Sequence, residues 1–166
     1  MADMNRNITS ANAKLVLTVH KTGTLLGGEG IENIFAPIEL QQFATDASFS
    51  QGDTQITETR MGVDGVMVAG YTPAIKQVQI SLEASSPSYA YLAMYWRAVE
   101  ASRNPLWCTL VATIPSISQV YTWTHGVLKQ GTIVPAGKKI LDPTTWTFDF
   151  EQLTIVGYDG IRKAAE

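Results

Sequence analysis

The clearest pattern in the chain is a two-residue alternation of apolar and polar positions. It occurs over residues 14–20, 76–83 and 145–151, where three apolar side chains occupy one face and mostly polar side chains the other. Because the side chains of a β-strand point alternately to opposite sides, this pattern predicts half-buried strands. The apolar faces consist of Leu15, Leu17 and Val19, of Val78, Ile80 and Leu82, and of Trp146, Phe148 and Phe150.

The second half of the chain contains further strand signals. Residues 107–114 are apolar on both faces, which is typical of a strand at the centre of a sheet. Residues 119–124 and 127–134 flank His125-Gly126, and we expect them to form a hairpin with a turn at that step. The alternation changes phase near Glu151-Gln152, which indicates a β-bulge there.

One segment has helical periodicity instead. Ser86 is a good N-cap and Pro87 a good first helical residue, because the missing N–H of proline would be unpaired there in any case. Apolar residues then recur at helical spacing as far as Asn104-Pro105: they are Tyr89, Leu92, Ala93, Trp96 and Val99. The order of elements predicts a mainly β fold, an antiparallel β-sandwich or barrel with one flanking α-helix over about residues 87–103. We expect residues 1–166 to form a single domain, because no linker or charge block divides them.

Two segments fit neither the strands nor the helix. Residues 21–37 are rich in glycine, and residues 57–71 surround the tight-turn signal Val63-Asp64-Gly65. Asp-Gly readily adopts the positive φ of tight turns, so the second segment is expected to be a long apolar hairpin. Such a hairpin on a small domain needs a partner surface. The candidate subunit-interface residues are Met61, Val63, Asp64, Val66, Met67 and Tyr71 in the hairpin, and Leu25, Leu26 and Ile34 in the glycine-rich segment.

Composition and charge narrow the range of partners. The chain has 166 residues, of which 45% are hydrophobic and 16% charged, and its net charge is −3. There is enough apolar mass for a packed core, and the sequence has no basic cluster of the kind that binds nucleic acid. No apolar run is long enough for a membrane-spanning helix, and the first residues lack the features of a secretion signal. We therefore expect a soluble protein made in the cytoplasm, with no membrane partner.

Residues suited to catalysis or metal binding are few and scattered. His20 and His125 are the only histidines, and neither has a carboxylate or cysteine at a ligand-like spacing. Cys108, the only cysteine, lies in an apolar strand with no activating base signalled nearby. Residues 23–30 lack the Gly-Lys-Ser/Thr ending of a phosphate loop. We expect no catalytic, cofactor-binding or metal-binding site, and hence no enzyme.

Two aromatic residues leave one class of ligand open. The helix and strand patterns place Trp96 and Trp146 in the core. Tyr121 and Trp123 fall on the outer face of the hairpin expected around His125, where aromatic rings can stack against a sugar. A carbohydrate-binding receptor module is therefore an alternative from a different class of protein.

Several stretches resemble small tail proteins of tailed bacteriophages. They are FATD at 43–46, TRMGVDG at 59–65, AGYTP at 69–73, VQISLEASSPS at 78–88 and PTTWTFDFE at 143–151. The resemblance extends over roughly residues 4–157 in the order of the elements. None of these motifs has a catalytic meaning, so the resemblance is specific for family and architecture only.

The resemblance implies the tail-tube fold, a β-sandwich with one flanking helix and a long hairpin that reaches a neighbouring subunit or ring. Copies would assemble as stacked hexameric rings through which DNA passes. The partners would be the sheath, baseplate and tape measure proteins of a contractile tail, with assembly in the host cytoplasm. Relatives are often labelled tail fiber proteins, but this chain has no repeats, coiled-coil heptads or β-helix periodicity, which favours the tube. A baseplate ring or tube initiator of the same fold is the alternative.

Overall fold

The computed structural model describes residues 13–20, 37–43 and 49–157, and the elements below lie within these ranges. One helix, α1 (Pro87–Ser102), and a short 3₁₀ turn (Pro115–Ile117) accompany the strands. The strands are β1 (Lys14–His20), β2 (Ile38–Glu39), β3 (Phe49–Gln51), β4 (Thr57–Met61), β5 (Met67–Tyr71), β6 (Lys76–Leu82), β7 (Trp107–Ile114), β8 (Gln119–Gly131) and β9 (Thr144–Gly157).

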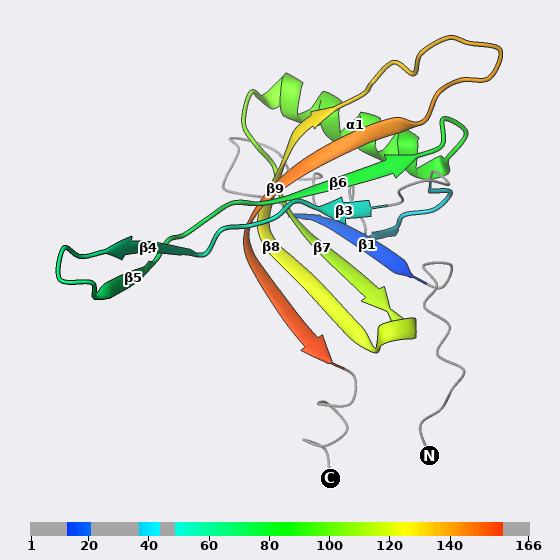
Figure 1. Ribbon diagram of the computed structural model, residues 1–166. Coiled ribbons are helices and arrows are strands. Elements are labelled where there is room, and N and C mark those ends of the chain that lie inside the picture. Colours follow the sequence, from blue (N-terminus) through cyan, green and yellow to red (C-terminus); the bar gives the residue numbers. More distant parts are fainter. Residues whose placement is uncertain (1–12, 21–36, 44–48, 158–166) are drawn as a thin grey trace, which may run out of the picture.

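Seven strands form one curved sheet in the order β2-β1-β7-β8-β9-β6-β3, and every pairing is antiparallel. Strands β8 and β9 are the longest, with 13 and 14 residues, and they join the two halves of the sheet (Figure 1). Strands β4 and β5 form a separate two-stranded hairpin. The fold class expected from the sequence is confirmed, in the form of a single half-barrel sheet with one helix beside it.

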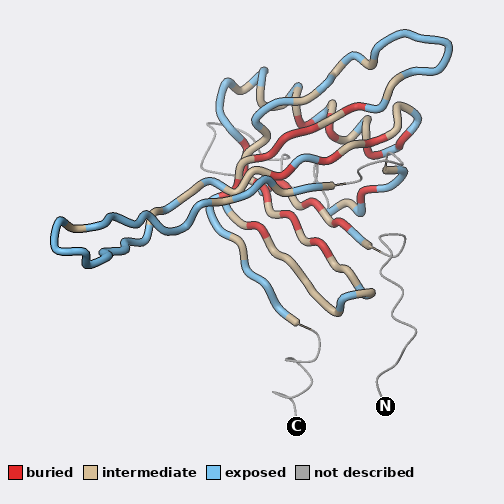
Figure 2. Tube along the Cα trace, in the orientation of Figure 1, coloured by how far each residue is buried: buried red, intermediate tan, exposed pale blue. Residues whose placement is uncertain are grey.

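The core follows the alternation seen in the sequence, and along the strands of the curved sheet buried residues alternate with less buried ones (Figure 2). In β6, for example, Val78, Ile80 and Leu82 are fully buried while Gln79 between them is exposed. The strand at 107–114 is β7, which lies between β1 and β8 as a central strand. The largest buried side chains include Leu15, Leu17, Leu110, Trp146, Phe148 and Phe150.

Helix α1 begins and ends as its sequence indicates. The Ser86 hydroxyl accepts a hydrogen bond from the Ser88 backbone N–H, and Pro87 occupies the first turn. Arg103 closes the helix in a left-handed conformation at φ 53°. The buried face is rotated from the expected stripe, because Leu92 and Tyr95 are its buried apolar residues and the expected core residue Trp96 is only half-buried.

The expected hairpin at His125-Gly126 is wrong. Strand β8 runs without interruption through this step, and it pairs with β7 on one side and β9 on the other. His125 adopts a positive φ of 52°, and the register between β7 and β8 shifts beside it. The glycine serves a different purpose from a turn: Gly126 pairs directly with Phe150, whose ring covers it so closely that no Cβ would fit.

The phase change near Glu151-Gln152 has a different origin from the expected bulge. Strands β8 and β9 keep one register through this point, from the pair of Thr124 and Gln152 to the pair of Gly126 and Phe150. Their register shift lies farther along, between Leu128 and Gln130 of β8. Both strands change phase together, so that positions three residues apart face the same core: these are Trp123 and the buried Gly126 in β8, and Phe150 and Leu153 in β9.

Candidate assembly surface

The hairpin of β4 and β5 projects from the curved sheet as a narrow arm (Figure 1). At its tip the Gly62 N–H donates to the Val66 carbonyl at 2.8 Å, and the Gly65 N–H donates to the Gly62 carbonyl at 2.9 Å. The Asp64 carboxylate accepts from the Val66 N–H at 3.1 Å, and Gly65 has a φ of +79°. This three-residue turn confirms the hairpin that Val63-Asp64-Gly65 predicts, with glycine where a left-handed conformation is required.

One face of the hairpin is largely apolar, with Thr57 and Thr59 as its polar members. Directly paired residues of antiparallel strands share a face, so Met61 and Met67 lie together, followed by Ala69 and then by Tyr71 at the root. Met61, Met67 and Tyr71 are 67%, 61% and 74% exposed. The other face includes the charged residues of β4, Glu58 and Arg60, beside Gly70 and Val68 of β5.

Six of the nine predicted interface residues can therefore be placed. Three of them, Met61, Met67 and Tyr71, lie on the apolar face, while Val63 and Asp64 form the tip and Val66 lies on the opposite face. Leu25, Leu26 and Ile34 lie outside the described residues. Three further apolar side chains that were not among the predicted interface residues are also exposed in and beside the hairpin: Ile56, Val68 and Ile75. The role of this set in a subunit interface stays a prediction.

The exposed hairpin has a free-energy consequence. Every residue of β4 and β5 is exposed, so the arm packs against no part of the described chain along its strands (Figure 2). Burying one Met or Val side chain of this kind contributes about 1.5–3 kcal/mol, and an isolated two-stranded hairpin is only marginally stable in water. A partner surface would therefore both cover and stabilise it.

A groove of about 530 Å³ lies at the root of the hairpin. Its lining includes Tyr71 and Ile75, together with Trp107 and His125, whose rings lie edge to face at a centroid distance of 5.5 Å. The Lys76 ammonium is held across β9 by a 2.9 Å hydrogen bond to the Glu151 carbonyl. The groove is thus continuous with the apolar face of the hairpin through Tyr71.

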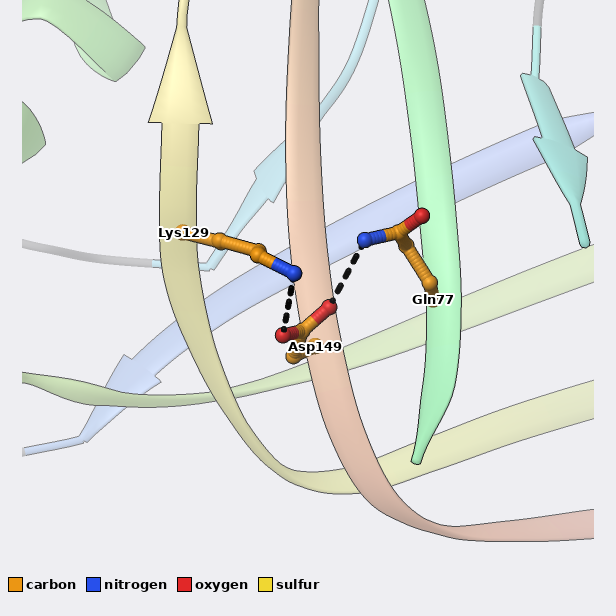
Figure 3. Close-up of polar contacts among 3 residues, drawn as sticks. All are labelled: Gln77, Lys129 and Asp149. Carbon is orange, nitrogen blue, oxygen red and sulfur yellow. Dashed lines mark hydrogen bonds and ion pairs between the residues drawn. The ribbon is translucent and has the colours of Figure 1, made fainter. Parts of the chain in front are cut away.

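The sheet face opposite the core is rich in uncharged polar side chains. Its main charged group in the β8–β9–β6 region is Asp149, which accepts from Gln77 at 3.3 Å and forms an ion pair with Lys129 at 3.3 Å (Figure 3). The charge of this carboxylate is therefore neutralised within the sheet. Register and alternation place the following uncharged polar residues on this face: Thr18, Gln77, Gln79, Ser81, Thr109, Thr113, Thr122 and Thr145.

One edge of the sheet has no partner strand in the described part of the chain. Strand β6 pairs with β9 as far as Phe150, whereas residues 151–157 of β9 pair with β8 alone. This stretch contains Ile155 and Val156, which are 58% and 37% exposed, and it has no lysine or proline to block pairing. An unprotected edge of this kind is a template for a strand from another chain.

The residues considered for chemistry form no catalytic arrangement among the described residues. His20 is exposed and contacts the Thr109 hydroxyl at 2.7 Å. Burial raises the pKa of the Cys108 thiol to about 12, which leaves it protonated and unreactive near neutrality. Within the described ranges there is no cluster of three His, Cys, Asp or Glu side chains that could hold a metal ion, and no helix is long and apolar enough to cross a membrane.

The aromatic pair left open for a sugar has a different placement from the one expected. Trp123 is only 3% exposed and faces the core, where it packs near Phe150. Its indole N–H donates to the Gln51 side-chain oxygen at 2.6 Å. Tyr121 stacks on it at a centroid distance of 6.0 Å and is half-buried. The interpretation of Trp123 as an outward binding platform is therefore wrong, because it assumed a turn at His125.

Comparisons with known proteins point to phage tails. Residues 6–154, most of the chain, match the protein-family model described as tail fiber protein gp32. None of the curated protein sequences matches the chain.

Solved structures of phage-tail-like particles contain chains of the same fold. A chain of the anti-feeding prophage baseplate aligns with a TM-score of 0.54 and 13% identity, covering 88% of this chain and 93% of that one. A chain of the PVC sheath-tube complex aligns with a TM-score of 0.54 and 10% identity, and the alignment covers 86% of this chain and 88% of that one. A chain of the PVC sheath/tube terminator aligns with a TM-score of 0.53 and 10% identity, and the alignment covers 86% of this chain and 93% of that one. At such low identity the similarity establishes the fold.

Proposed function

We propose that this chain, which belongs to the family of tail fiber protein gp32 and is therefore a structural tail protein, forms the rings of a phage tail tube. The observation that supports this function best is the apolar hairpin of β4 and β5, exposed along its whole length on a curved antiparallel sheet. A surface of this kind is satisfied by further copies of the same chain. The ring of six copies follows from the resemblance to tail-tube proteins.

Ring formation is supported by the open edge of β9. Residues 152–157, beyond the Glu151 carbonyl that Lys76 occupies, can accept a strand from the next copy, which would continue the sheet around the ring and remove the exposed edge. A head-to-tail contact closes into a ring when its rotation divides the circle. The curvature of the half-barrel sheet is consistent with such closure (Figure 1).

Passage of DNA is supported by the chemistry of the sheet face opposite the core. Each phosphate that a protein neutralises adds affinity for DNA, so a channel wall should present few cations. On this face Lys129 is paired with Asp149, and the side chains around this pair are mostly threonine, glutamine and serine. The exposed cation Lys14 lies on the same face at the start of β1. We propose that this face lines the lumen, in contact with DNA only during passage.

A single ring at the baseplate, or a tube initiator, is the second candidate. It is favoured by the fold similarity to a chain of the anti-feeding prophage baseplate. The similarity to a chain of the PVC sheath-tube complex favours the repeated tube equally, together with a contractile tail in which sheath, baseplate and tape measure proteins are neighbours. The copy number in a virion separates the two, because a single ring contains about six copies and a tube contains many tens.

The test is removal of the hairpin tip. Deletion of residues 63–67 should leave a folded subunit that no longer polymerises, because it removes the turn and part of the apolar face. The control is the double substitution Arg97→Ala and Glu100→Ala, which changes two exposed side chains of α1 that belong to neither the hairpin nor the β8–β9 loop. Electron microscopy and sedimentation of the purified proteins give the readout, with circular dichroism to verify folding.

Rings or tubes formed by the full chain, and only folded monomers from the 63–67 deletion, would support the proposal. Normal polymers from the 63–67 deletion would refute the role of the hairpin. A full chain that stays monomeric at high concentration and is absent from virions would refute the tube function itself.

A further inference from the structure

A second exposed apolar segment joins β8 to β9. Residues 132–143 contain Val134, Ile140 and Leu141, which are 80%, 83% and 50% exposed. Beside Ile140 and Leu141 there is a hollow of about 270 Å³, whose other wall is the turn between β6 and α1 at Glu83 and Ser85. The segment therefore presents apolar side chains around a depression rather than a flat surface.

This loop has a defined conformation. The Thr132 N–H donates to the Thr145 carbonyl at 3.0 Å at its base, and the Asp142 N–H donates to the Ala136 carbonyl at 3.2 Å across it. The Lys138 ammonium lies 2.8 Å from the Asp142 carboxylate. The Tyr89 hydroxyl of α1 donates to the Ile133 carbonyl, which fixes the loop to the helix. A surface held in this way loses little conformational freedom on binding.

The loop and the hairpin extend from opposite sides of the sheet (Figure 1). A contact between two different surfaces at opposite sides of a subunit is heterologous, and it repeats without limit when its geometry does not close. The hairpin of one copy and the loop of another are thus suited to a stack. Met61 and Met67 suit the hollow in particular, since methionine side chains are flexible enough to fill irregular apolar depressions.

Charge favours the same pairing. The hairpin has a net charge of −1 from Glu58, Arg60 and Asp64, and the acidic residue is at the tip. The loop has a net charge of +1 from Lys138, Lys139 and Asp142. Lys138 is already paired with Asp142, whereas Lys139 forms no ion pair with a described residue. Asp64 uses one carboxylate oxygen in the turn and retains a second acceptor oxygen.

We propose that the apolar face and tip of the hairpin bind the loop at residues 132–143 of a second copy, with Met61 and Met67 at the hollow and Asp64 beside Lys139. This inference rests on the proposed function and adds to it the surface that receives the hairpin. The occupant of the loop is a copy in the neighbouring ring, so that each contact adds one ring to the stack.

The test is reversal and exchange of the two charges in the full chain. Asp64→Lys and Lys139→Glu should each raise the critical concentration for tube growth by roughly fivefold or more, because each places like charges together. The double variant should restore it to within roughly twofold of the original chain. Asp64→Asn keeps the side-chain oxygen of the turn, so any loss it causes reports the charge and not the hairpin conformation.

The matched control is Glu58→Lys, which reverses a charge on the other face of the hairpin. Lys139→Glu should not rescue it. Unchanged tube growth by both Asp64→Asn and Lys139→Glu, while the original chain forms tubes, would overturn the contact and leave the tube function intact. No assembly by the original chain would overturn both.

Discussion

Gly126 gives the sharpest test of how the bent centre of the sheet is packed. A Cβ added at this position would lie closer than 3.0 Å to three ring atoms of Phe150, and that ring is only 1% exposed. The ring cannot swing into solvent, so Gly126→Ala forces the backbone or the core to shift. Overpacking of this kind costs about 1–3 kcal/mol of unfolding free energy.

The alanine also restricts the unfolded chain, which stabilises the protein by about 0.4–1 kcal/mol and partly offsets the clash. Gly52→Ala is the matched control, because a Cβ there meets nothing within 4 Å. The difference between the two variants isolates the clash with Phe150. For a chain of this size, a difference of about 2 kcal/mol corresponds to roughly 4–8 °C in Tm.

Urea denaturation of the unassembled subunit, followed by circular dichroism at low protein concentration, measures the difference directly. A double-mutant cycle adds Phe150→Ala, which removes the ring atoms that the new methyl group would meet. We expect a coupling energy of about 1 kcal/mol or more, because Gly126→Ala should destabilise the Phe150 variant less than it destabilises the original chain. If Gly126→Ala and Gly52→Ala agree within about 0.5 kcal/mol, the close packing of ring on glycine does not hold.

Two further predictions concern stability. Ser86→Ala removes both the helix cap and the hydroxyl that donates to the Gln41 carbonyl. Thermal denaturation should therefore show a free energy of unfolding that is lower by about 1–2 kcal/mol. The control Ser85→Ala, at an exposed position, should change it by less than about 0.5 kcal/mol. Folding raises the Cys108 pKa from 9.0 to about 12, so the unfolded chain loses this proton first. The free energy of unfolding should therefore not change with this group below pH 9, and it should fall between pH 9 and 12 by up to about 1.4 kcal/mol per pH unit. In Cys108→Ala the free energy of unfolding should fall less steeply with pH over the same range.

Local periodicity was sufficient to locate most of the strands and the helix. Burial on one side of a sheet imposes a two-residue repeat, and Ser86 and Pro87 specify a helix start through backbone groups close in sequence. The tip of the β4–β5 hairpin was predictable for the same reason, because Asp64 and Gly65 satisfy the turn locally. These features depend on neighbours along the chain.

The errors occurred where a distant contact decides the role of a residue. His125-Gly126 looks like a turn, but its glycine makes room for Phe150, which lies 24 positions later in the chain. The wrong turn then placed Trp123 outside the core. The apolar face of the hairpin required the pairing of Met61 with Met67, since a shift of one residue would move one of them to the other face.

The exposed hairpin also affects the life of the subunit before it reaches a particle. A newly made copy holds Met61, Met67 and Tyr71 in water until another copy covers them. During that interval the arm is open to proteases and to unproductive sticking, and the interval shortens as synthesis raises the local supply of copies. Rapid, abundant production thus protects the very surface that makes the subunit useful.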